Sequence, residues 1–158
     1  GNLVQRIEAA GAAGVALFNR FYQPDLNLDS MDISQTISLS RSRDALITMR
    51  WIALLYGHVN LSLAATGGVH TVKDALKMLL CGADVTHLCS ALLTNGPGQI
   101  ERLHDGILAW MQQREYESLH QLKGSLSQKN SPDPVAFERG NYLQMLSRYE
   151  PPKSVWPD

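Results

Sequence analysis

The chain has 158 residues, of which 44% are hydrophobic and 18% charged, and its formal net charge is -1. These values are typical of a globular domain with a sizeable core, and they give no basic excess for binding nucleic acid. No apolar run reaches the roughly 18 residues that cross a bilayer. Residues 1–8 lack the basic flank and apolar run of a signal peptide, so we expect a cytoplasmic protein that binds neither nucleic acid nor membranes.

The two cysteines, Cys81 and Cys89, lie inside apolar segments. Their spacing is not CxxC, and no histidine pair stands near them at zinc-ligand spacing. We expect free thiols in a reducing compartment, with a disulfide between the two as the alternative.

Apolar residues recur at helical or strand spacing along most of the chain. In chain order they predict a helix over 2–10, a strand over 14–18, a helix over 45–56, a strand over 59–65, a helix from Thr71 to Gly82, a strand over 85–88 and a helix that follows Pro97. Thr71 and Asp74 have the spacing of a capping box. Alternating helices and strands indicate an α/β fold with a parallel sheet, and three strands cannot close a barrel.

Two regions give weaker patterns. In the long connection 22–43, residues 31–33 and 36–39 alternate in polarity, which predicts a small hairpin outside the main sheet. Beyond Tyr116 the periodicity fades. We expect a short helix over 119–123, a turn over 130–134, a helix over 136–148 and an extended end over 150–158.

Two turns follow neighbouring strands and meet at one edge of the predicted sheet. Gly67-Gly68 ends one strand and Cys89-Ser90 ends the next, 22 residues later. Adjacent glycines let backbone N–H groups approach an anion closely, and helices that begin after such turns add partial positive charge. The pair predicts a phosphate-binding corner whose ligand is open; the alternative for Gly67-Gly68 alone is a plain tight turn.

The residues of this corner resemble a known family. Ala65-Thr66-Gly67-Gly68-Val69, Gly82-Ala83-Asp84-Val85 and Leu88-Cys89-Ser90-Ala91-Leu92 look like the flavin-phosphate end of the dihydroorotate dehydrogenases. The Cys-Ser-Ala portion is also similar to the flavin domain of dihydropyrimidine dehydrogenase. Leu17 to Phe21 reads as in the branch called dihydroorotate dehydrogenase-like. The resemblance covers most of residues 1–126.

The resemblance implies a fold and a set of site residues. The fold is a partial TIM (β/α)8 barrel: its last three or so βα units over 1–115, with a C-terminal helical extension over 116–158. Gly67, Gly68, Cys89 and Ser90 would hold the phosphate of FMN, with Ala65 and Thr66 along its edge. Asn19 would face a pyrimidine-type substrate; its alternative role is a turn residue that closes a strand. No residue of this chain is expected to be catalytic.

The chain departs from the family at two places. Ser40-Arg41-Ser42-Arg43 replaces a glycine-rich turn that contributes to the flavin site, so that either a serine or an arginine side chain takes over its contacts or the flavin sits differently. Arg20 stands beside Asn19 where a smaller residue is common. It could counter a substrate carboxylate or lie on the surface.

The resemblance implies the C-terminal part of an FMN-dependent oxidoreductase that acts on the CH–CH bond of a dihydropyrimidine such as dihydroorotate. The flavin-ring lysine and the catalytic base would lie on preceding strands, so the expected partner is the N-terminal half of the barrel or a second copy of the chain. Two alternatives are a non-redox TIM-barrel enzyme that binds a phosphorylated substrate, and a non-catalytic fragment.

Overall fold

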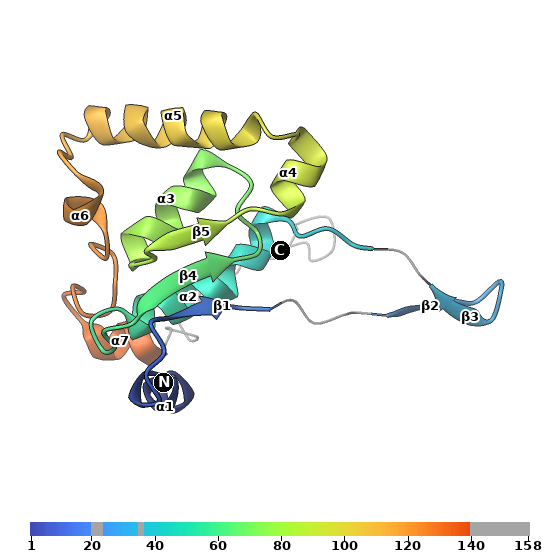
Figure 1. Ribbon diagram of the computed structural model, residues 1–158, viewed down its shortest axis with the longest axis horizontal. Helices are drawn as coiled ribbons and strands as arrows, with labels where there is room; N and C mark the ends of the chain where they lie inside the picture. The colour runs from blue at the N-terminus through green and yellow to red at the C-terminus, as the bar shows by residue number, and fades with distance from the viewer. Residues whose placement is uncertain (20–23, 35–36, 140–158) are drawn as a thin grey trace, which may run out of the picture.

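The computed structural model describes residues 1–19, 24–34 and 37–139, and Figure 1 shows their arrangement. The elements are α1 (Asn2–Ala9), β1 (Gly14–Leu17), β2 (Asp25–Asn27), β3 (Asp32–Ser34), the 3-10 helix η1 (Ser42–Asp44), α2 (Ala45–Leu55), β4 (Ser62–Thr66), α3 (Val72–Cys81), β5 (Val85–His87), α4 (Ser90–Asn95), α5 (Gln99–Gln113), α6 (Leu119–Leu122) and α7 (Pro134–Arg139). The predicted alternation of helices and strands is confirmed.

The main sheet has the order β1-β4-β5, and both pairs of strands are parallel. Gly14 is paired with Ser62, and Ala64 lies between Ala16 and Val85 in the register. The fold is therefore α/β with a parallel sheet, as predicted, and the described residues form no closed barrel. The strand predicted to begin at Val59 begins at Ser62, because its partner β1 begins at Gly14.

One face of this sheet carries the core. The buried strand residues Leu17, Leu63 and Ala65 pack with buried residues of α2 and α3, including Ile52 and Met78. A second cluster of Leu76, Met111 and Leu122 joins α3 to α5 and α6. Leu122, in the segment after Tyr116, thus packs on α3 and α5. The predicted boundary between residues 115 and 116 stays a prediction.

The other face of the sheet has no helix over it in the described chain. Its residues alternate with those of the core face and are small or polar in the two longer strands: Gly14, Ala16 and Ser62 are exposed, and Ala64 and Thr66 are half-buried. On β5 the exposed residues are Val85 and His87. Parallel sheets in folded proteins are almost always covered on both faces.

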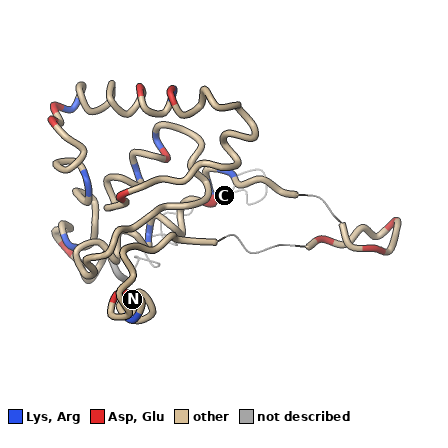
Figure 2. The backbone as a smooth tube through the Cα atoms, viewed as in Figure 1, with Lys and Arg blue, Asp and Glu red and all other residues tan. Residues whose placement is uncertain are grey.

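The hairpin lies outside the main sheet, as expected, but it pairs β2 with β3. The predicted second strand over 36–39 was wrong for residues 37–39, which form no strand, and Thr36 lies outside the described residues. Asn27 begins the turn, since its side-chain oxygen accepts hydrogen bonds from the N–H groups of Asp29 and Ser30. Figure 1 shows the hairpin extending away from the body, and Figure 2 shows acidic residues along it.

The structure also bears on four further expectations. The capping box of α3 is present, and Gly82 ends that helix in the left-handed conformation. Both cysteines are free, so the disulfide alternative is not found. No helix in the described part of the chain is long and apolar enough to cross a membrane. The predicted helix over 136–148 corresponds to α7 as far as Arg139, and the rest of it and the extended end lie outside the described residues.

Candidate functional site

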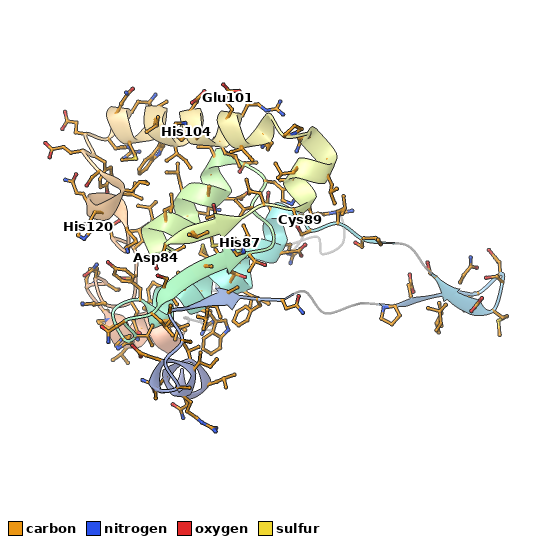
Figure 3. All side chains as sticks on the ribbon, viewed as in Figure 1. Asp84, His87, Cys89, Glu101, His104 and His120 are labelled. Atoms are coloured by element: carbon orange, nitrogen blue, oxygen red, sulfur yellow. The ribbon has the colours of Figure 1, made fainter. Side chains whose placement is uncertain are left out.

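The predicted corner is a single pocket at the carboxyl ends of the strands. Its volume is about 420 Å³, and its lining includes six of the residues chosen from the sequence: Asn19, Thr66, Gly67, Gly68, Cys89 and Ser90. Figure 3 shows His87 and Cys89 at this end of β5, with Asp84 at the opposite end. The two turns meet because β4 and β5 run parallel with Thr66 paired to His87.

Gly67 and Gly68 both adopt positive φ, +84° and +76°, which disfavours any residue with a Cβ atom. The two glycines have different surroundings. A Cβ at Gly68 would overlap the backbone of Ala45, so this glycine lets the turn pack against the start of α2. A Cβ at Gly67 would meet nothing within 4 Å, so this glycine borders open space. The turn therefore leaves room for a ligand beside Gly67.

Ser40 ties the corner together from the segment before α2. It is only 8% exposed. Its hydroxyl oxygen accepts the N–H of Gly68 at 3.3 Å and lies 3.3 Å from Nε2 of His70. Its own N–H donates to the hydroxyl of Ser90 at 3.1 Å.

Asp74 fixes the turn that leads from this corner into α3. Its Oδ2 accepts hydrogen bonds from the Ser42 hydroxyl at 2.7 Å, from the N–H and hydroxyl of Thr71 at 2.9 Å each, and from the N–H of His70 at 3.2 Å. Burial by itself raises the pKa of this carboxyl, but the hydrogen bonds outweigh it, and the pKa lies below its ordinary value. The carboxylate therefore stays charged and holds residues 70–74 in place.

The other residues chosen from the sequence take varied positions. Asn19 is exposed and borders both this pocket and a neighbouring one of about 520 Å³. Thr66 uses its hydroxyl to bond the carbonyl oxygen of Phe18 at 3.2 Å. Ala65 does not line the pocket: it is 0% exposed in the core, since alternate strand residues face opposite ways. Arg20 lies outside the described residues.

The lining residues that were not chosen as site residues from the sequence include two polar ones, Ser40 and His87. Ser40 stands 28 residues before its partner Gly68, and no local spacing connects them. His87 could have been found from strand alternation, because it is the residue on β5 that pairs with Thr66.

The pocket has the chemistry of an anion site. Its lining offers backbone N–H groups at a glycine turn, the hydroxyls of Ser38, Ser40 and Ser90, and the imidazole of His87. The described lining residues include no carboxylate that would repel a phosphate. No group of three His, Cys, Asp or Glu residues that could hold a metal ion occurs in the described chain.

Comparisons with known proteins show what the chain is similar to. The model of the family described as "Dihydroorotate dehydrogenase" matches residues 35–111. The catalytic subunit of dihydroorotate dehydrogenase B (NAD(+)) of Enterococcus faecalis is 31% identical over 123 residues, which are 76% of this chain and 39% of that protein. A Streptococcus pyogenes relative assigned as a dihydroorotate dehydrogenase A (fumarate) is 34% identical over 71 residues, 45% of this chain and 23% of its own length.

A solved structure extends the likeness to the fold. The ligand-free DHODH from Eimeria tenella superimposes with a TM-score of 0.64 at 21% identity, covering 83% of this chain and 36% of that one. The chain thus spans between about a quarter and two fifths of the length of these relatives.

Proposed function

The chain belongs to the dihydroorotate dehydrogenase family, and from that premise we propose that it supplies the FMN-phosphate site of an oxidoreductase that acts on a dihydropyrimidine such as dihydroorotate. The observation that carries the proposal is that Gly67, Gly68, Cys89 and Ser90 line one pocket. The described residues that line this pocket include no carboxylate. In this proposal its three strands are the last three of a (β/α)8 barrel.

The residues present fit a phosphate. Gly67 borders open space, Gly68 has a backbone N–H directed at the corner, and Ser90 has a hydroxyl that can donate. A bound FMN would supply hydride acceptance from the CH–CH bond of the substrate. This chain would anchor the phosphate with these groups, and Asn19 at the pocket mouth would donate to and accept from the ring of a pyrimidine-type substrate.

The bare face of the sheet supports a role for a further part of the barrel. Ala16, Ser62 and Val85 on that face are exposed, and a parallel sheet is rarely stable with one open face. We propose that the N-terminal half of the barrel, or a second copy of the chain, covers it. Sedimentation of the 158-residue protein, alone and mixed with an N-terminal barrel fragment of a relative, measures whether either complex forms. A protein that stays monomeric alone and does not bind the fragment contradicts the proposal.

The test of the phosphate site compares FMN with riboflavin, which lacks the phosphate. Titration of the protein followed by flavin fluorescence should show binding of FMN at least tenfold tighter than that of riboflavin. Equal affinity for the two flavins, or binding of neither, contradicts an FMN-phosphate site.

A matched pair of variants locates the site at Gly67. Asn and Asp have similar size and both tolerate positive φ, so Gly67→Asn and Gly67→Asp differ mainly in charge. Because a carboxylate at this position faces the proposed phosphate, Gly67→Asp should bind FMN about tenfold or more weakly than Gly67→Asn. Identical FMN affinity in the two variants would place the phosphate elsewhere.

A further inference from the structure

We propose that Ser40 sets the affinity of the corner for phosphate, because its hydroxyl oxygen accepts the hydrogen bond of a backbone N–H group that the phosphate must bind. The inference rests on the proposed function, which makes Gly68 a phosphate contact. Ser40 is nearly buried, and its hydroxyl oxygen lies on the N–H of Gly68 at 3.3 Å. The corner as folded therefore already satisfies this donor from within the chain.

The competition follows from the single proton of a backbone N–H group. A phosphate oxygen bound to Gly68 would sit about 2.9 Å from its nitrogen. That is the direction in which the Ser40 oxygen stands, so the two acceptors cannot both take a full hydrogen bond. A phosphate must displace the Ser40 hydroxyl before it can bind Gly68.

The backbone of Ser40 acts differently from its side chain. Its N–H donates to the hydroxyl oxygen of Ser90 at 3.1 Å. A hydroxyl that accepts one hydrogen bond still has its own proton to donate. This contact therefore does not compete with an anion for the Ser90 proton, and of these two contacts only that of the Ser40 side chain opposes binding.

The Ser40 hydroxyl lies between two polar groups, the N–H of Gly68 and the imidazole of His70. Nε2 of His70 lies 3.3 Å from the Ser40 oxygen. Displacing the hydroxyl from Gly68 therefore costs about the worth of that one hydrogen bond. We expect Ser40 to weaken phosphate binding by about three- to tenfold, the range of one ordinary hydrogen bond.

The experiment titrates the protein with FMN and, separately, with inorganic phosphate. The readouts are flavin fluorescence and the chemical shift of the Gly68 amide. Ser40→Ala removes only the competing hydroxyl and should bind both ligands about three- to tenfold more tightly than the wild type. Ser40→Thr keeps the hydroxyl and should stay within twofold. Ser42→Ala is the matched control, because it loosens the same segment at Asp74 without touching Gly68, and it should not tighten binding.

Each other outcome has a meaning. Weaker binding by Ser40→Ala would make Ser40 a ligand of the phosphate and overturns the proposal, as does equal tightening in Ser42→Ala. If FMN does not bind but inorganic phosphate binds Ser40→Ala more tightly and shifts the Gly68 amide, the competition stands and the FMN assignment fails. If neither ligand binds any variant, both fail.

Discussion

The two faces of the β1-β4-β5 sheet differ in what their residues contribute. The face under α2 and α3 presents Leu17, Leu63 and Ala65, all buried, whereas the opposite face presents glycine, alanine, serine and threonine from β1 and β4. The covered face stabilises this part of the chain. The bare face contributes little within it, and its small side chains suit close packing by something else.

The sharpest test of this difference replaces one residue on each face. Leu63 is 2% exposed and Val85 is 48% exposed. We expect Leu63→Ala to lower the free energy of unfolding by about 3 kcal/mol, because it leaves a cavity in the core. Val85→Ala should cost less than about 1 kcal/mol. Urea denaturation of the two variants measures both values.

A partner on the bare face would change that result. If the N-terminal half of the barrel covers this face, Val85→Ala should become more costly in its presence while Leu63→Ala stays the same. Equal costs for both substitutions in the chain alone would contradict the comparison.

The covered side also depends on a close fit around Tyr56. Cβ atoms at Gly124 and Gly82 would both overlap the Tyr56 ring, and Gly124 has φ of +78°. Gly124→Ala should lower the free energy of unfolding by about 2 to 3 kcal/mol, from positive φ and from the overlap. Gly96→Ala is the control, since Gly96 has φ of +77° but open space around it, and should cost about 1 kcal/mol. Similar thermal denaturation of the two variants would show that the Tyr56 contact is unimportant.

Asp74 makes the free energy of unfolding depend on pH. Because the pKa of Asp74 is lowered in the folded protein, its stabilisation is complete above the ordinary carboxyl pKa and is lost as pH falls through the folded value. Asp74→Asn should cost about 1.5 kcal/mol at pH 7, and this difference from the wild type should shrink below about pH 4. Denaturation at pH 7 and pH 3 measures this difference, with the exposed Asp105→Asn as control. A difference that grows in acid would contradict a lowered pKa of Asp74.

The smallest expected effect concerns the two thiols. Cys81 is buried on the covered side, and burial raises the pKa of its thiol to about 11. Cys89 is exposed at the pocket. At pH 8 a thiol reagent should modify Cys89 quickly while the protein keeps its secondary structure. It should modify Cys81 only after the protein unfolds. Saturating FMN should slow the reaction at Cys89; rapid modification of both thiols would contradict the burial of Cys81.

Parts of the fold that depend on local sequence were predictable. The capping box of Thr71 and Asp74 and the left-handed stop at Gly82 follow from residue type and spacing, and the structure confirms both. Six of the seven residues chosen for the corner line one pocket, because parallel strands place their following turns at the same edge of the sheet.

The errors have both local and long-range causes. Residues 25–27 and 36–39 both alternate in polarity, and the Asn27 turn selected the first as the partner of β3. The short helix α4 was missed because six residues carry too little periodicity. The role of Ser40 rests on contacts to residues 28 to 50 positions away, which no local pattern reveals.

Tyr56 also links the segment after α6 to the body of the protein. Its hydroxyl donates to the carbonyl oxygen of Lys123, and its ring lies between Gly82 and Gly124. A large ring at position 56 therefore requires glycine at both 82 and 124. In evolution these three positions should change together: sequences with a small residue at 56 are free to carry a side chain at 82 or 124, and such covariation would mark the relatives that share this packing.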